Sequence, residues 1–249
     1  MARLRITAAS RVGRVRSNNE DMVLVGGAFI RNDATESEVD LDSANRYLLA
    51  LADGMGGYSG GEVASQDVLS NLHFFFYDMP TGFGDDQFKD AINNWLVSIC
   101  LTIHSKGKSA PEFKDMGTTL VSMIYYEHEF YWLNCGDSRL YRLHDGRLTQ
   151  VTTDHSLSAL TGSHENSNII TNCIGGGCKS SFIDIMKFTE DVLPGDTFLL
   201  CSDGLNDMIA DTEIERLMLN GADALTLCNA AEIAGGRDNV SVCLIKVEN

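Results

Sequence analysis

The order of strand-like and helix-like patterns limits the fold of this chain more than any other feature. Short segments rich in β-branched and aromatic residues recur along it, and longer helical patterns interrupt them in only two regions, one early and one late. The regular alternation of strand and helix that is typical of a doubly wound parallel sheet is missing from the pattern. We therefore predict an α+β fold in which two mainly antiparallel sheets pack together, with helices outside them.

Periodicity predicts the individual elements. Strands are expected at 3–8, 22–26, 47–52, 118–126, 129–135, 140–144, 182–188, 197–201 and 239–247. Helices are expected at 64–76, 88–103, 211–218 and 222–234. The links YYEHEF and HDGR predict hairpin turns. Segments 31–45 and 158–181 are polar or rich in Gly, Ser and Asn, and we expect them to be irregular.

Composition excludes several classes of protein. The chain of 249 residues has no linker-like segment and no repeat, so a single domain over 1–249 is expected. Its net charge of −16 argues against nucleic-acid and anionic-membrane partners, which need a basic surface. No apolar run reaches the roughly 18 residues of a membrane span, and MARLRITAAS does not match a signal peptide. We expect a cytoplasmic monomer.

The cysteines suggest a reducing environment. There are seven, and none forms a CxxC pair. Cys135, Cys201 and Cys243 lie in apolar, strand-like segments, which suits buried and reduced thiols. A zinc site has no support from the spacing.

Acidic clusters stand at the edges of four apolar strands, in NNED, LADGMGG, CSDGL and GGRDNVSV. A single Asp-Gly is usually a turn, but carboxylates gathered from several strand ends repel one another and need a cation. Oxygen ligands of this kind suit Mg²⁺ or Mn²⁺. The glycine after Asp53 would let a backbone carbonyl approach such a cation closely.

Arg16 lies five residues before Asp21, in VGRVRSNNED. A guanidinium beside a metal pair is suited to clamping a phosphate, because it is planar, always charged and two-pronged. The alternative interpretation is a surface arginine, since Arg11 and Arg14 are close in sequence.

At this point the sequence resembles the metal-dependent (PPM, or type 2C) serine/threonine protein phosphatases, in their compact bacterial form. The resemblance covers nearly the whole chain and consists of six blocks in family order: VRSNNED, LADGMGGYSGGEVAS, DMGTTL, NCGDSRLYRLHDGRLTQVTTDHS, LLCSDGL and GGRDNVSV. It implies a four-layer αββα sandwich in which helix pairs flank the two sheets. The metal site would lie in a cleft at one end.

The resemblance also implies roles for individual residues. Asp53 would bridge two Mn²⁺ or Mg²⁺ ions, and Gly54 would offer its backbone carbonyl to one of them. Asp203 and Asp238 would hold the other ion, which makes Asp53, Asp203 and Asp238 the predicted catalytic residues. Asp21 would join the cluster directly or through water.

Further residues would surround these ligands. Arg16 would bind the substrate phosphate, and Asp115 would help to hold a weak third metal ion. Glu20 and Asn239 would lie behind the ligands. In the implied reaction, water activated by the two ions attacks the phosphorus of phosphoserine or phosphothreonine in line.

The chain departs from the family pattern in two places. Met55 occupies the position of a histidine found in eukaryotic relatives, so protonation of the leaving group falls to a metal-bound water or another group. His155, in TTDHS, is a candidate only by its place in the pattern, and a structural role is the commoner one for a histidine. The segment between His155 and Phe182 is shorter than the flap of many bacterial relatives.

Several functional alternatives remain open at this stage. No cysteine has an arginine six positions later, which excludes a cysteine-dependent phosphatase. A pseudophosphatase that binds phosphoproteins without turnover is the main alternative. Among enzymatic roles, opposing a bacterial Ser/Thr kinase is the leading hypothesis, beside action on anti-sigma antagonists and control of a secretion system.

Overall fold

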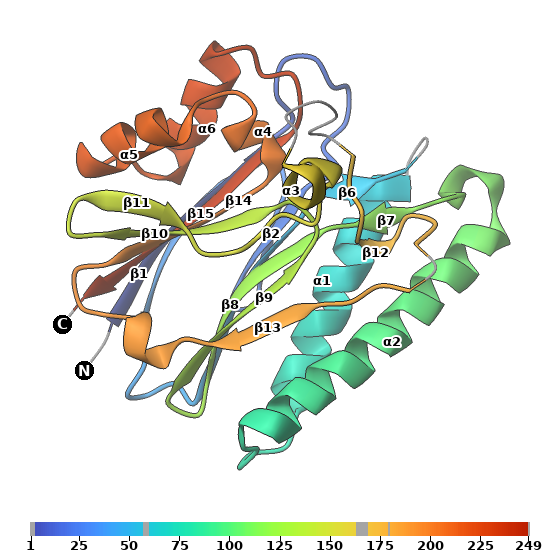
Figure 1. Ribbon diagram of the computed structural model, residues 1–249, viewed down its shortest axis with the longest axis horizontal. Helices are drawn as coiled ribbons and strands as arrows, with labels where there is room; N and C mark the ends of the chain where they lie inside the picture. Colours follow the sequence, from blue (N-terminus) through green and yellow to red (C-terminus); the bar gives the residue numbers. More distant parts are fainter. Residues whose placement is uncertain (1–2, 57–59, 163–168, 179, 249) are drawn as a thin grey trace.

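The computed structural model of the chain describes residues 3–56, 60–162, 169–178 and 180–248. Two large sheets lie face to face, and a group of helices covers the outer face of each (Figure 1). The order of the layers is helices, sheet, sheet, helices. This confirms the α+β sandwich with mainly antiparallel sheets.

The first sheet has the strand order β11-β10-β14-β15-β1-β4, and all neighbours are antiparallel. Its strands are β1 (Arg3–Arg11), β4 (Ala34–Asp40), β10 (Arg139–His144), β11 (Arg147–Gln150), β14 (Thr197–Cys201) and β15 (Val240–Glu248). Between β10 and β11, Asp145 and Gly146 both have positive φ, 47° and 79°, as a tight two-residue hairpin requires. The turn predicted from HDGR is confirmed.

The second sheet has the order β13-β9-β8-β5-β2-β3 and is also antiparallel. Its strands are β2 (Met22–Val25), β3 (Ala28–Ile30), β5 (Arg46–Ala52), β8 (Leu120–Tyr126), β9 (Glu129–Cys135) and β13 (Asp184–Lys187). The predicted hairpin in YYEHEF joins β8 to β9. A small third sheet, β12-β7-β6, consists of β6 (Gly54–Met55), β7 (Gly117–Thr118) and β12 (Ile174–Gly175).

Helices α1 (Gly60–Asp78) and α2 (Asp85–Ser109) cover the second sheet, and α4 (Asp203–Asn206), α5 (Asp211–Leu219) and α6 (Ala224–Ile233) cover the first. The short α3 (Leu157–Thr161) follows β11, and two 3₁₀ turns occupy Pro111–Phe113 and Thr189–Asp191. No helix among the described residues combines the length and the apolar character needed to cross a bilayer.

Strand β5 shows why its sequence is a continuous apolar run. Leu49 and Leu51 point into the core between the two sheets, whereas Leu48 and Ala50 point into the core beneath α1 and α2. All four are at most 1% exposed. Burying one leucine of this kind contributes about 1.5–3 kcal/mol, so β5 holds the sheet between two cores and fixes the position of Asp53 at its end.

Two expectations about irregular segments need correction. Segment 31–45 contains β4, which pairs with β1 through partners such as Leu4 and Val39. Its sequence, ATESEVD, is exposed or half-buried at every position because β4 lies at the edge of the sheet, so it lacks the usual apolar alternation. Segment 158–181 contains most of α3 and all of β12, while residues 163–168 and 179 lie outside the described residues.

Candidate functional site

The register of the second sheet brings two of the predicted carboxylates together. Met22, the first residue of β2, pairs with Ala52, the last residue of β5. Asp21 immediately precedes β2, and Asp53 immediately follows β5. Antiparallel pairing therefore places both aspartates at one end of this sheet.

The first sheet brings together the other two predicted carboxylates, Asp203 and Asp238. Cys201 at the end of β14 pairs with Val242 near the start of β15. Asp203 follows β14 as the first residue of α4, and Asp238 lies two residues before β15. Carboxylates that are far apart in sequence thus stand at neighbouring strand ends in each sheet.

Asp21 connects the two pairs. It is completely buried, and its Oδ2 accepts a hydrogen bond of 2.7 Å from Oγ of Ser202, which follows β14 in the first sheet. Its Oδ1 is also buried and receives no hydrogen bond from the described residues. Burial raises the pKa of Asp21 to about 6, with a further contribution from the charge of Asp238, although the hydroxyls of Ser202 and Ser241 oppose the rise.

Asp53 and Asp203 lie in the same electrostatic environment. Burial raises the pKa of Asp53 well above its ordinary value, and the charges of Asp21, Asp203, Asp137 and Asp238 raise it further. The pKa of Asp203 is likewise raised by burial first and then by neighbouring carboxylates, among them Asp137 and Asp238. Side chains that affect one another in this way are close together, so Asp21, Asp53, Asp203 and Asp238 lie near one another, and their roles as metal ligands stay a prediction.

Glycine at position 54 is required by packing. A Cβ on Gly54 would clash with the backbone of Gly61 in α1 and with the carbonyl oxygen of Glu20. The backbone of Asp53 is fixed beside it, because Thr118 Oγ1 and Thr119 N donate to the Asp53 carbonyl at 2.8 and 2.9 Å. The glycine thus allows α1 and the Asp21 segment to approach the end of β5 closely.

Arg16 lies at the cluster and not on a remote surface. Its Nη2 donates to Asp238 Oδ2 at 2.6 Å, and its side chain is 53% exposed. This hydrogen bond raises the pKa of Arg16, although burial partly offsets it, and the charges of Glu20 and Asp53 act in the same direction as Asp238. The guanidinium therefore lies where it can reach both solvent and the carboxylates.

Glu20 and Asn239 lie beside the carboxylates and are joined by a hydrogen bond. Asn239 is 5% exposed, its Oδ1 accepts from Glu20 N at 2.8 Å, and its Nδ2 donates to the carbonyls of Val12 and Asn18. Its side chain thereby ties the Arg16 loop to the segment that carries Asp238. Burial raises the pKa of Glu20.

Asp115 and Asp137 differ in their relation to this cluster. Asp115, the candidate ligand of a third metal, is exposed, has a φ of 58°, and is not among the main charges acting on Asp21, Asp53 or Asp203. Asp137 is 7% exposed, its buried Oδ1 lacks a hydrogen-bond partner among the described residues, and burial raises its pKa to about 6. Sequence reasoning did not single out Asp137, which lies two residues after the end of β9 within NCGDSR.

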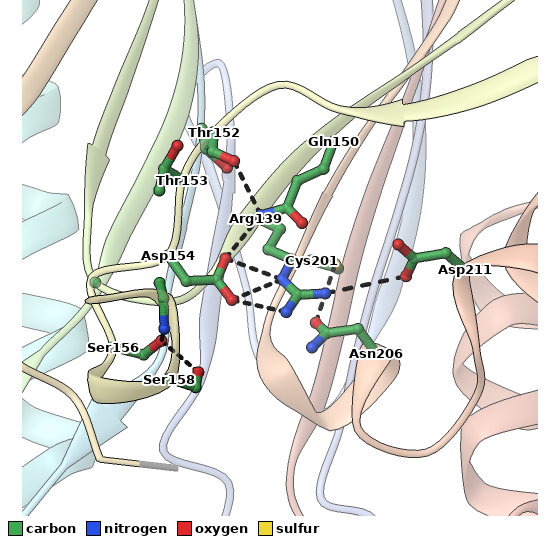
Figure 2. Close-up of polar contacts among 12 residues, drawn as sticks. Arg139, Gln150, Thr152, Thr153, Asp154, Ser156, Ser158, Cys201, Asn206 and Asp211 are labelled. Carbon is green, nitrogen blue, oxygen red and sulfur yellow. Dashed lines mark hydrogen bonds and ion pairs between the residues drawn. The ribbon is translucent and has the colours of Figure 1, made fainter. Parts of the chain in front are cut away.

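A partly buried ion pair between Arg139 and Asp154 supports the region around Asp137. In Figure 2, Arg139 lies between Asp154 and Asp211, and its Nε and Nη2 donate to the carboxylate of Asp154 at 2.7–3.0 Å. Burial alone would lower the pKa of Arg139, but the hydrogen-bonded Asp154 carboxylate raises it. Tyr141 accepts a further hydrogen bond from Arg139 Nη1. Sequence reasoning did not identify this network.

His155 has a structural role. It is 8% exposed, and its Nδ1 accepts hydrogen bonds from the backbone N of Gly136 and from Asn172 Nδ2. Its Nε2 lies 3.0 Å from Asp184 Oδ2, so both ring nitrogens are engaged. The ring therefore links the end of β9 to the start of β13 through these hydrogen bonds.

The oxygen donors of the cluster fit divalent cations. Carboxylate and carbonyl oxygens suit Mg²⁺ or Mn²⁺, and Asp21 Oδ1, which has no partner among the described residues, is available to such an ion. Among the described residues, no group of three or more His, Cys, Asp or Glu side chains forms a ready-made cage for a metal ion. Such a cage is unnecessary, because Mg²⁺ usually binds through one or two carboxylates and keeps several waters.

Two packed antiparallel sheets flanked by helices form the fold that this chain shares with solved serine/threonine phosphatases. The chain belongs to the protein phosphatase 2C family, which it matches over residues 29–232.

Individual relatives agree with this family. The chain is 32% identical to the serine/threonine protein phosphatase PstP of Mycobacterium tuberculosis (strain H37Rv), over 98% of its own length and 45% of PstP. It is 30% identical to the serine/threonine phosphatase Stp of Listeria monocytogenes (strain EGD-e), over 94% of this chain and 92% of Stp. A solved structure of the PstP catalytic domain in complex with two manganese ions matches with a TM-score of 0.76 and 32% identity, covering 100% of both chains. The chain thus spans about half of PstP and nearly all of Stp.

Proposed function

We propose that this chain is a metal-dependent protein phosphatase that hydrolyses phosphoserine and phosphothreonine on proteins, with residues 1–249 forming one catalytic domain. The observation that carries the proposal is the gathering of Asp21, Asp53 and Asp203 from the ends of both sheets, with Arg16 beside them. The named relatives, which are serine/threonine phosphatases, favour turnover over a pseudophosphatase.

The same residues would hold two Mn²⁺ or Mg²⁺ ions. Asp53 would bridge them, Gly54 would offer its carbonyl to one, and Asp203 and Asp238 would hold the other. Asp21 would contribute Oδ1, the oxygen to which no group in the described part of the chain donates a hydrogen bond. When bound, such ions supply the Lewis acidity that makes water nucleophilic near neutral pH.

Arg16 would bind and orient the substrate. Its guanidinium is fixed at one side by Asp238 and exposed at the other, so two of its donors can face a phosphoryl group. A phosphate bound there would sit against the carboxylate cluster only if the negative charge of the cluster is neutralised. Substrate affinity should therefore depend on both Arg16 and the divalent cation.

A phosphate-release assay tests this function. Wild-type protein with Mn²⁺ should release phosphate from p-nitrophenyl phosphate and from a phosphothreonine peptide, and chelation should abolish the release. Asp53→Asn should nearly abolish turnover while the protein stays folded. Asp90→Asn, which makes the same change at an exposed position of α2, is the matched control. Wild-type rates in Asp53→Asn would contradict the bridging role, and an inactive but folded wild type would favour the pseudophosphatase.

We infer that the physiological partner is a bacterial Ser/Thr kinase or the substrates of that kinase. The support is the resemblance and the names of the relatives, which are serine/threonine phosphatases. Comparison of the phosphoproteome of a deletion strain with that of its parent tests this role. Phosphorylation should rise at Ser and Thr sites of one kinase, and no change at such sites would contradict it.

A further inference from the structure

Cys173 and Cys178 form a close pair of thiols beside the small third sheet. Their Sγ atoms are 3.2 Å apart, although the sequence has no CxxC motif. The three glycines at 175–177 all have positive φ, between 58° and 80°, and the N–H of Cys178 donates to the Gly175 carbonyl at 2.9 Å. Only glycine adopts such a run without strain, and the turn that the three glycines form brings the two thiols together.

The two thiols differ in access. Cys178 is half-buried and lines a cavity of about 790 Å³ between α2 and the glycine turn, together with Lys108 and Lys114. Reactive cysteines are typically partly exposed and near positive charge, and Cys178 shares its cavity with these two lysines and with one carboxylate, Asp115. Cys173 is 3% exposed, and burial together with the neighbouring Cys178 raises its pKa. An oxidant that enters the cavity therefore meets Cys178 first, with Cys173 directly behind it.

The pair is connected to the carboxylate cluster through hydrogen-bonded strands. Ile174 and Gly175 pair with β7, and β7 pairs with β6, which contains Gly54. Gly176 N donates to the Met116 carbonyl at 2.8 Å. Thr118, the second residue of β7, donates from its hydroxyl to the Asp53 carbonyl. A change in the turn that holds the thiols thus reaches Asp53 through one strand.

We propose that Cys173 and Cys178 are a modification site for hydroperoxides, at which a reversible disulfide forms and lowers the activity of the adjacent metal site. The Cys178 thiolate attacks the peroxide O–O bond, giving a sulfenic acid and releasing hydroxide or alkoxide. The Cys173 thiol then attacks the Cys178 sulfur, the S–S bond forms, and the sulfenic oxygen leaves as water. Two electrons pass from the two sulfurs to the peroxide, and a thiol reductant reverses the reaction.

The separation of the two sulfurs sets an upper limit on the effect on turnover. A disulfide bond is about 2.05 Å long, so the two sulfurs must approach by about 1.2 Å from their present separation of 3.2 Å. A displacement of about 1 Å at a catalytic site can lower turnover by as much as about 100-fold. We expect the oxidised protein to lose activity within that limit and to recover it fully after reduction.

The disulfide can be mapped without any activity measurement. Trypsin cleavage at Arg147 and Lys179 releases peptide 148–179, which contains Cys173 and Cys178 and no other cysteine. After treatment of the chelated protein with hydrogen peroxide and then catalase, this peptide should lack two hydrogens and resist alkylation. Cys173→Ser should instead accumulate sulfenic acid at Cys178, detectable with dimedone. Cys100→Ser, which removes another thiol that lines the cavity, is the matched control and should still form the disulfide.

The consequence for the site has two readouts. The first readout, the effect on turnover, rests on the proposed phosphatase function. Phosphate release is measured with Mn²⁺ before oxidation, after oxidation and after reduction. Hydrogen–deuterium exchange of the amides in β6 and β7 needs no turnover and should change on oxidation in wild type and Cys100→Ser but not in Cys178→Ser. Oxidation confined to other cysteines, or a mapped disulfide that alters neither turnover nor exchange, would overturn the proposal. An inactive reduced enzyme that still shows the exchange change would refute the phosphatase function alone.

Discussion

Replacing Asp21 by asparagine should stabilise the protein in a chelating buffer. Asp21 is fully buried, and its pKa is raised from an ordinary value of 3.8 to about 6. A difference of one pKa unit corresponds to about 1.36 kcal/mol, so the ionised carboxylate destabilises the fold by about 3 kcal/mol above pH 6. Asn cannot ionise, and its amide can still accept from Ser202 while donating toward the adjacent Asp53.

The sign of the pH dependence follows from proton binding. Because the folded state holds the Asp21 proton more tightly than the unfolded state, the free energy of unfolding falls as pH rises from about 4 to about 6. Asp21→Asn should reduce this fall without removing it, since the pKa values of Asp53 and Asp203 are also raised.

Thermal unfolding in EDTA across pH 4–8 measures the effect. For a chain of this size about 1 kcal/mol corresponds to about 2–4 °C, so Asp21→Asn should melt about 6–12 °C above wild type at pH 7.5 and close to it near pH 4. Saturating Mn²⁺ should reverse the order, because only the wild type offers an anionic Oδ1. Asp90→Asn serves as the exposed control. An unchanged or lower melting temperature for Asp21→Asn in EDTA, with an unchanged pH slope, would refute the reasoning.

Three further substitutions test the surroundings of the cluster. Asp137→Asn should weaken Mn²⁺ binding in calorimetry more than Asp115→Asn does, since Asp137 acts electrostatically on Asp53 and Asp203 while Asp115 is exposed; the opposite order would restore Asp115 as the ligand of a third ion. Arg139→Met should cost about 3–5 kcal/mol in urea unfolding, because it leaves the largely buried Asp154 without its partner. A loss below about 1 kcal/mol would mean that the pair behaves like a surface ion pair. Gly54→Ala should lower the free energy of unfolding by at least about 1–3 kcal/mol by overpacking, and an unaltered melting curve would contradict the close approach of α1.

The sequence predicts the strands and helices whose side chains are buried in a regular pattern. The run LLALA and the hairpin YYEHEF are of this kind, because burial on one or two faces dictates residue type. Strand β4 was missed for the opposite reason: it is an edge strand, and neither of its faces is fully buried. The two-residue strands β6 and β7 are set by pairing between distant segments, and so short a strand has no periodicity of its own.

The sequence identifies those candidate site residues whose type and position at a strand end already indicate metal binding. Several acidic clusters at strand ends carried that signal together, because one Asp-Gly alone, such as Asp145-Gly146 after β10, is an ordinary hairpin turn. The distinction between Asp115 and Asp137 depends on burial, which the sequence pattern around the two residues does not reveal. The contact between Cys173 and Cys178 depends on the folded glycine turn, because a separation of five residues has no fixed distance in an irregular segment.

The cluster also links the two sheets of the sandwich. Asp21 and Asp53 come from one sheet and Asp203 and Asp238 from the other, so ionising all four without a cation would place like charges where the two sheets meet. The hydrogen bond from Ser202 to Asp21 is a direct link between them. Cations shared by all four carboxylates would convert that repulsion into attraction, and ligand at 100 times its dissociation constant stabilises a fold by about 2.7 kcal/mol. The same geometry that would make the site catalytic therefore makes metal binding part of the stability of the sandwich.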